Sequence, residues 1–242
     1  MNEHAGRIAK LREKMREAGI DVYYIPMCDC HNSEYVAEHF RCIKYLSGFT
    51  GSAASVIVTQ EGAWLFTDGR YFIQAANELQ DSGIELMKMG EPGVPELTVF
   101  MTEKSEGKVL GFNGSVVPAY FGKKFTGEIK SDRDLVGEIW EDRPEQIFTD
   151  IYELPIEYTG ESSESKIQRI REKIGEQVDK NVDYLYIINS LDDIAWIFNM
   201  RADDVQNNPV QFAYAAISKD KVTLYTGTKT PAMPFGFFLS MG

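Results

Sequence analysis

Cysteine is scarce in this chain of 242 residues, which contains only three. An odd number of cysteines does not form a disulfide framework, so we expect reduced thiols. Cys28, Cys30 and the adjacent His31, with Cys42 farther along, are residue types that zinc prefers as ligands. The C-x-C-H spacing lacks the two-residue gap of a zinc knuckle and argues against a metal site, which metal analysis of the purified protein tests.

Long apolar runs and an excess of basic residues are also absent. No apolar run reaches the roughly 18 residues that span a bilayer, and the first residues lack the apolar core of a secretory signal. We therefore expect a cytoplasmic protein. The formal net charge of −12 argues against nucleic acid and membrane surfaces as partners. With 43% hydrophobic residues, the chain can supply the core of one or two domains.

The stretch from Tyr45 to Ala76 organises the predicted fold. Ser55–Thr59 and Ala63–Thr67 are β-branched and aromatic runs separated by Gln-Glu-Gly, a pattern typical of a β-hairpin. The sequence Asp-Gly-Arg at 68–70 then leads into a predicted helix. Both runs are therefore expected to be central strands of a sheet.

Helices and strands alternate on both sides of this hairpin. Glu3–Ala18 has apolar residues at helical spacing, and Asp21–Pro26 reads as a buried strand. A short helix through Phe40 is predicted next, with Asn32 or Ser33 as its N-cap. After the hairpin we predict strands at 84–89 and 108–112 and helices at 94–102, 118–125 and 135–140. Such alternation is typical of an α/β domain, and the span 141–160 is the predicted linker.

The same order of elements starts again after residue 160. Ile167, Ile170 and Ile174 have the spacing of the first helix, and residues 183–188 match the pattern of the first strand. A short helix at 191–198 and strands at 210–218 and 221–226 complete a second copy that stops early. We therefore predict two domains, at 1–155 and 156–242.

Several motifs in both copies resemble one known family, the Xaa-Pro aminopeptidases (aminopeptidase P) of the creatinase and prolidase type. The resemblance extends over residues 5–228. Its motifs are His31-x-Ser-Glu-Tyr35, Ser47-Gly-Phe-Thr-Gly-Ser-Ala53, Trp64-x-x-Thr-Asp-Gly-Arg-Tyr-Phe-x-Gln-Ala75, Met87-x-Met-Gly90, Trp140-x-Asp-Arg-Pro144, Leu191-Asp-Asp-Ile-Ala-Trp196 and Asp204-Val-x-x-Asn-Pro-Val210.

The resemblance implies an α/β fold of two tandem creatinase N-terminal-like domains, each a mixed sheet flanked by helices, with the second truncated. In that family these domains precede a catalytic "pita-bread" domain. Its dinuclear metal centre, usually manganese, removes the N-terminal residue before proline. The resemblance therefore implies proline-containing peptides as family substrates, the missing catalytic domain as a partner, and a homo-oligomer.

The chain departs from the family pattern in ways that bear on function. Ala54 and Ala202 stand where the pattern usually has glycine, so their backbones are expected to avoid positive φ. A dinuclear hydrolase needs clustered carboxylates, usually with histidine, but the histidines are His4, His31 and His39 only. We therefore expect no metal cofactor in this chain and no activity of the chain alone, as in a naturally short protein, a truncated gene product or a cloned fragment.

Four residues are candidates for lining the substrate cleft of a complete enzyme. Arg70 can hold a carboxylate bidentately; alternatively, it ties the hairpin to the helix that follows. His31, Glu34 and Tyr35 can line the same cleft, although His31 is equally a capping or loop residue. No catalytic residue and no metal ligand is assigned.

Other features have structural interpretations. Trp196 and the Asp192-Asp193 pair are interpreted as core and N-terminal capping residues of a helix. The tail Lys229–Gly242 no longer resembles the family, and its origin stays open. Because the second copy stops early, we expect an uncovered sheet edge and face, self-association, and a Phe235–Leu239 segment that folds back or packs on a partner.

Two classes of function follow. The first is a noncatalytic N-terminal region of an Xaa-Pro aminopeptidase that shapes substrate access and makes dimer contacts. The second is a freestanding binding or assembly module with the same fold and no role in peptide hydrolysis, since fold does not fix function. The DNA sequence downstream of codon 242 discriminates between them.

Overall fold

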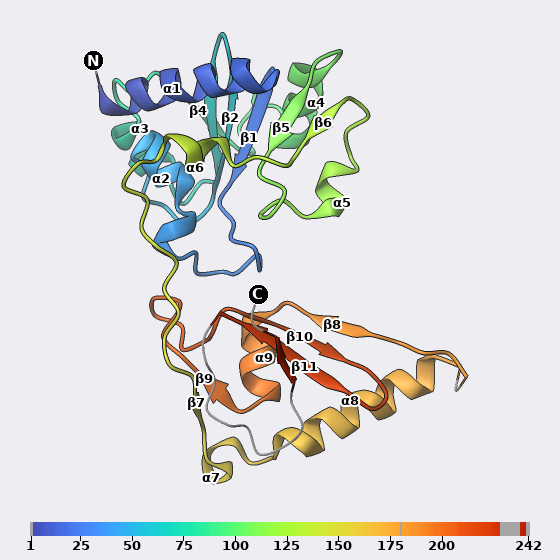
Figure 1. Cartoon of the computed structure of the whole chain (residues 1–242). Helices are drawn as coiled ribbons and strands as arrows, with labels where there is room; N and C mark the ends of the chain where they lie inside the picture. The colour runs from blue at the N-terminus through green and yellow to red at the C-terminus, as the bar shows by residue number, and fades with distance from the viewer. Residues whose placement is uncertain (1, 180, 228–237, 241–242) are drawn as a thin grey trace. The chain divides into compact units, whose positions relative to one another are not determined.

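The computed structural model describes residues 2–179, 181–227 and 238–240. Its contacts divide the chain into two compact units (Figure 1). Unit 1 comprises Met1–Cys30 and Glu38–Glu145, and unit 2 comprises His31–Ala37 and Gln146–Gly242. Each unit has its own sheet and its own hydrophobic core.

Unit 1 is built on a six-stranded mixed sheet in the order β4-β3-β2-β1-β5-β6. The predicted hairpin forms its centre, because β1, β2 and β3 pair antiparallel, while β4, β5 and β6 join in parallel. The strands are β1 (Val22–Pro26), β2 (Ala54–Thr59), β3 (Ala63–Thr67), β4 (Glu85–Lys88), β5 (Leu110–Phe112) and β6 (Ile129–Lys130).

Helices cover both faces of this sheet (Figure 1). Successive residues of β1 point to opposite faces. Tyr23 joins the core under α1, α2, α3 and α6, and Tyr24 joins the core under α4 and α5. The helices are α1 (Glu3–Ala18), the 3₁₀ turn η1 (Glu38–Phe40), α2 (Cys42–Ser47), α3 (Phe72–Glu78), α4 (Leu97–Ser105), α5 (Ala119–Gly122) and α6 (Leu135–Ile139).

The prediction of a helix through Phe40, capped by Asn32 or Ser33, is wrong. Asn32 has a φ of 56°, in the left-handed region, and helical backbone appears only in the 3₁₀ turn Glu38–Phe40. The helix of this region is α2, which begins at Cys42 and ends at Gly48 with a φ of 75°. Only a residue that tolerates positive φ closes such a helix without strain, so Gly48 is the C-terminal signal.

Unit 2 contains a four-stranded sheet in the order β12-β11-β10-β8 and a two-stranded sheet of β7 and β9. Its strands are β7 (Tyr152–Glu153), β8 (Tyr186–Ile188), β9 (Met200–Arg201), β10 (Ala213–Ile217), β11 (Val222–Thr226) and β12 (Phe238–Ser240). Its helices are α7 (Ile156–Thr159), α8 (Ser163–Gln177) and α9 (Leu191–Ile197).

Part of the span 141–160, predicted as a linker, is folded into unit 2. Ile151 is buried in the core of this unit, and β7 pairs with β9. The backbone N–H and the hydroxyl of Thr149 donate to Asp204 Oδ1 at 2.6 and 2.9 Å. Independent folding of residues 1–155 and 156–242 stays a prediction, which separate expression of the two pieces tests.

The strand registers identify the internal repeat residue by residue. In unit 1, Tyr23 pairs with Val58, and Val58 pairs with Ala63 across the hairpin. In unit 2, Tyr186 pairs with Ile217, which pairs with Val222. Tyr186 therefore has the position of Tyr23. The addition of β12 in parallel to β11, as β4 lies parallel to β3, corrects the expectation that the second sheet ends at β11.

Polar contacts of the first helix repeat in the same way. The guanidinium of Arg7 donates to the carbonyl oxygen of Tyr45 at 2.5 Å, and Lys166 donates to that of Trp196 at 2.7 Å. Each cation also lies over the ring of the same aromatic residue, at 4.1 and 4.3 Å from its centroid. These matching contacts confirm two tandem copies of one α/β unit.

Unit 2 has no counterpart of α4 and α5 in the described residues. Tyr24 and Phe66 are buried beneath those helices in unit 1. By register, their counterparts are Ile187 and Tyr225, which are 65% and 43% exposed. One face of the second sheet is therefore open over β8 and β11.

We expect Tyr23→Phe to lower the free energy of unfolding by about 1–3 kcal/mol, because it leaves buried backbone groups without partners. The Tyr23 hydroxyl donates to Arg133 O and accepts from Leu135 N–H, both at 3.1 Å. The matched control, Tyr186→Phe, changes a half-exposed residue and should stay within about 0.5 kcal/mol. Urea denaturation of the full chain measures both variants; equal effects would contradict the assignment.

Candidate functional site

Arg70 lies in the turn between β3 and α3 and is held by Asp68. Its Nε and Nη2 donate to the two carboxylate oxygens of Asp68 at 2.9 and 2.8 Å. The backbone N–H of Arg70 also donates to Asp68 Oδ1 at 3.0 Å, an Asx-type turn contact. These hydrogen bonds to Arg70 lower the pKa of Asp68 to about 2. Asp68 therefore occupies the two guanidinium donors with which Arg70 could hold another carboxylate. Both side chains stay accessible to solvent.

A polar network beside Arg70 was missed by sequence reasoning. The backbone N–H and the hydroxyl of Thr50 donate to Glu78 at 3.0 and 2.6 Å. Gln74 donates to Thr50 Oγ1 at 2.8 Å, and Tyr71 shares a 2.7 Å hydrogen bond with Ser52. The bonded residues are 19 to 28 positions apart in the sequence, so no local spacing predicts the network.

His31 is part of the packing of unit 2. It is buried, its Nδ1 lies 3.0 Å from the carbonyl oxygen of Asn189, and its ring lies 4.3 Å from that of Tyr214. Glu34 and Tyr35, a few residues later, are exposed. These three residues belong to unit 2 and Arg70 to unit 1. A common substrate cleft for the four stays a prediction.

Two of the three cysteine thiols, those of Cys28 and Cys42, are desolvated by burial. Burial raises the pKa of Cys28, and it raises the pKa of Cys42 to about 12. Cys42 also lies 3.9 Å from Arg143 Nη2. Within residues 2–179, 181–227 and 238–240, no three His, Cys, Asp or Glu side chains are grouped to hold a metal ion.

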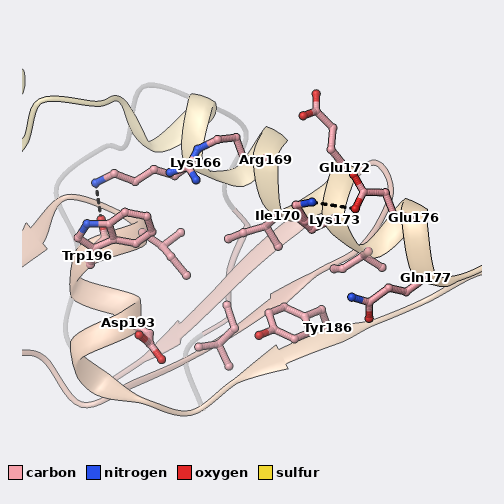
Figure 2. A pocket seen from close by; sticks show the side chains of 13 residues that line it. Lys166, Arg169, Ile170, Glu172, Lys173, Glu176, Gln177, Tyr186, Asp193 and Trp196 are labelled. Carbon is pink, nitrogen blue, oxygen red and sulfur yellow. Dashed lines mark hydrogen bonds and ion pairs between the residues drawn. The ribbon is translucent and has the colours of Figure 1, made fainter.

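A groove of about 560 Å³ lies between α8, α9 and β8 of unit 2 (Figure 2). Lys166 and Trp196 lie at one end of it, and Tyr186 lies on the strand side. Trp196 is 48% exposed, so its interpretation as a core residue is wrong. Asp192 and Asp193 lie in the first turn of α9, where the Ser190 side chain accepts the capping bond from Asp193 N–H.

Lys166 connects α8 to α9 at the end of the groove. Its ammonium donates to Trp196 O at 2.7 Å and to Asn199 Oδ1 at 2.6 Å. Desolvation lowers the pKa of this buried amine. Asn199, with a φ of 53°, holds the left-handed position that Gly48 holds in unit 1. The polar contacts of Lys166 therefore close one end of the groove. The rest of the groove, which includes apolar lining residues, is open to solvent.

Comparison with known families gives the same division of the chain. Residues 7–143 and residues 142–233 match two models, each described as the creatinase/prolidase N-terminal domain. The chain belongs to this family. The two matched ranges meet at residues 142–143, where unit 1 ends and unit 2 begins within a few residues.

Curated relatives of this chain are considerably longer. A probable Xaa-Pro aminopeptidase P of Colletotrichum graminicola is 38% identical over 231 residues, which are 91% of this chain and 37% of the relative. One of Tuber melanosporum is 39% identical over 230 residues, which are 90% of this chain and 36% of the relative. The chain thus spans little more than a third of the curated relatives it matches.

A solved structure supports the same relationship. The X-prolyl aminopeptidase of Caenorhabditis elegans, described as a cytosolic enzyme with a di-nuclear active site, is 31% identical and superimposes with a TM-score of 0.85. The alignment covers 93% of this chain and 39% of the nematode chain.

We expect Arg70→Ala to raise the pKa of Asp68 from about 2 toward its ordinary 3.8, because the first cause of the depression is the hydrogen bond from Arg70. Asp68 therefore stabilises the fold above its ordinary pKa, and this contribution is lost as pH falls toward 2. Carboxyl-carbon NMR titration of the full chain measures the shift. The matched control is Glu161, whose low pKa depends on Arg169 and should not move. An unchanged Asp68 titration would show that Arg70 does not hold the carboxylate in solution.

Proposed function

We propose that this chain is the noncatalytic N-terminal region of an Xaa-Pro aminopeptidase, a metallopeptidase that releases the N-terminal residue before proline. The observation that carries the proposal is the match to the nematode X-prolyl aminopeptidase, with a TM-score of 0.85 over 93% of this chain. The curated fungal relatives, 38% and 39% identical, carry the same activity in their names.

In this proposal, chemistry belongs to a catalytic domain outside these 242 residues, and the two units shape access for proline-containing peptides. A hydrolytic pair of metal ions, proposed to be manganese, needs clustered carboxylates and histidine to activate water. Two of the three histidines of this chain contact backbone carbonyl oxygens. His31 Nδ1 contacts Asn189 O, and His39 Nδ1 lies 2.8 Å from Pro144 O.

The proposed substrate-cleft residues are Arg70, His31, Glu34 and Tyr35. Arg70 and its partner Asp68 are accessible, and a substrate carboxylate that displaced Asp68 would meet the same two donors. Exposed Glu34 and Tyr35 are available for contact, whereas buried His31 fixes the segment that carries them.

We propose a cytoplasmic location, supported by the description of the nematode relative as cytosolic. None of the helices in the described part of the chain is long and apolar enough to cross a membrane. The net charge of −12 favours neither nucleic acid nor an anionic membrane surface as a partner.

The purified chain should not hydrolyse an Xaa-Pro peptide, with or without added manganese, because the proposed function places the metal ligands elsewhere. Release of the N-terminal residue is followed by chromatography, with a full-length Xaa-Pro aminopeptidase as the positive control. Turnover that follows the protein through purification and disappears on chelation would contradict the proposal.

A freestanding binding or assembly module is the second candidate function. The open groove of unit 2 and the exposed Ile187 and Tyr225 favour it, because apolar surfaces of this kind mark interaction sites. A downstream reading frame that encodes metal ligands would exclude a freestanding role.

We further propose self-association through β8. In unit 1, β5 pairs with the edge of β1, but among the described residues β8 pairs only with β10. An unpaired strand edge with exposed Leu185 and Ile187 is a template for another strand. Of the segment Phe235–Leu239, expected to cover this sheet, only Phe238 and Leu239 fall among the described residues, in β12 beside β11.

Light scattering of the full chain should therefore show a dimer or larger species. Ile187→Lys should shift it toward monomer, since an edge charge opposes strand pairing, and deletion of residues 156–242 should abolish association. Ile73→Lys, at an exposed position of α3, is the matched control and should not change the mass. A full chain that is monomeric at the concentration used for the variants would refute the proposal.

A further inference from the structure

The chain passes between the two units three times. It leaves unit 1 after Cys30, returns to it at Glu38 and leaves it again after Glu145. The segment His31–Ala37, which belongs to unit 2, is therefore connected to unit 1 at both of its ends. How firmly this segment is fixed depends on what holds the chain where it returns to unit 1.

The return and the last exit are joined within unit 1 by reciprocal hydrogen bonds. Arg143 Nε donates to His39 O at 2.8 Å, and His39 Nδ1 lies 2.8 Å from Pro144 O. A carbonyl oxygen has no hydrogen to donate, so Nδ1 of His39 carries the hydrogen and donates it. His39 directly follows Glu38, and Pro144 directly precedes Glu145. We call this arrangement of His39, Arg143 and Pro144 the crossing clasp.

Arg143 is itself fixed by other contacts. Its Nη1 donates to Asp134 Oδ2 at 2.7 Å, and its backbone N–H donates to Trp140 O at 3.2 Å. The side chains of Arg143 and Asp134 are only 16% and 25% exposed. Because a guanidinium presents its donors in a planar fork, one side chain bonds both the Asp134 carboxylate and the His39 carbonyl oxygen. Arg143 thus ties the crossing clasp to the start of α6.

Gly137 in α6 leaves the space that this guanidinium occupies. A Cβ atom at position 137 would lie 2.5 Å from Arg143 Nη1 and 2.8 Å from Asp134 Oδ2, closer than non-bonded atoms approach. The backbone of Gly137 is helical, and glycine is unfavourable inside a helix. The glycine is therefore explained by the fit of Arg143 and not by its own backbone conformation.

The chain is also held where it enters unit 2. His31 Nδ1 lies 3.0 Å from Asn189 O, and the His31 ring lies 4.3 Å from that of Tyr214. On the last exit, Thr149 donates two hydrogen bonds to Asp204 Oδ1. Residues 32–38 and 145–148 therefore each connect a fixed point of unit 2 with the crossing clasp of unit 1.

We propose that Arg143 is a positioning residue that closes the crossing clasp and so fixes the unit 1 end of the segment carrying Glu34 and Tyr35. Without the guanidinium, the His39 and Pro144 backbones lose their common anchor at Asp134, and the two parts of the chain move separately. The place of Glu34 and Tyr35 in a substrate cleft rests on the proposed function, but the clasp does not. A test of the clasp needs no peptidase assay, so the two proposals fail on different results.

The test is NMR of the histidine rings in the full chain, which has only three histidines. At about pH 8.5 a free imidazole is neutral, and the hydrogen bond of one ring nitrogen selects the tautomer. We expect His39 to be the Nδ1–H tautomer. Arg143→Ala should shift its ring nitrogen signals toward those of a free imidazole. His31, which donates from Nδ1 to Asn189 O in unit 2, is the internal control and should not change.

Cleavage by a glutamate-specific protease measures how often the clasp opens. Arg143→Ala should accelerate cleavage after Glu38 and after Glu145 by about tenfold or more, the change in local opening expected when a hydrogen bond to a charged group is lost. Arg133→Ala is the matched control, because it removes the neighbouring bidentate pair with Glu138. It should leave the cleavage rates and the His39 signals unchanged.

A second variant, Gly137→Ala, keeps every residue of the clasp. Alanine favours the helix more than glycine does, yet its Cβ displaces the guanidinium of Arg143. Gly137→Ala should therefore change the His39 signals and both cleavage rates as Arg143→Ala does, with no loss of helix content by circular dichroism. This combination separates an open clasp from a general loss of stability.

Three results would overturn the proposal. The first is an Nε2–H tautomer of His39 in the unmodified chain, because Pro144 O would then have no donor. The second is a set of His39 signals that stays unchanged in both Arg143→Ala and Gly137→Ala. The third is an equal change of the His31 and His39 signals, because Arg143 would then stabilise the whole chain and not the clasp.

Discussion

A β-sheet buries apolar residues on two faces, and the need to cover both faces governs this molecule. Alternate residues of β1 point to opposite sides, so Tyr23 and Tyr24 need separate helical layers. Unit 1 supplies α1, α2 and α6 on one side and α4 and α5 on the other. Among the described residues, unit 2 repeats four of the six strands and the first two helices, so one face is partly covered, and Ile187 and Tyr225 are exposed on the other.

Both units retain a contact in which a cationic side chain of the first helix bonds to an aromatic residue of the second helix. Arg7 and Lys166 differ in chemistry, yet each donates to a carbonyl oxygen at the end of a helix and lies over the ring of that residue. A cation at a helix C-terminus also interacts favourably with the helix dipole. One side chain thus links the first helix to the last turn of the second helix in both units.

The strands and the repeat were predictable because their signals are local. Val56, Ile57 and Val58 are β-branched and buried, and the spacing of Ile167, Ile170 and Ile174 marks a helical face without any knowledge of the fold. Arg70 was assigned either to a substrate cleft or to the turn, and its bonds to Asp68 support the local role without testing the cleft. Sequence separation explains the failures. The hydrogen-bond network joins Thr50 to Gln74 and Glu78, which lie far along the sequence. The exposure of Trp196 likewise depends on which helices and strands pack beside it.

A tyrosine occupies the same register position in β1 and β8, so the repeat preserves this side chain. A residue that only filled an apolar core would need no hydroxyl, yet Tyr23 uses its hydroxyl both as donor and as acceptor at the start of α6. Tyr186 keeps the same side chain at the same register where no helix lies over it in the described residues. A phenol is amphipathic and loses little conformational entropy when it is fixed, which suits a surface that meets a helix start. The groove of unit 2 thus has the polar group that fixes a helix in unit 1 as well as the apolar residues beneath it.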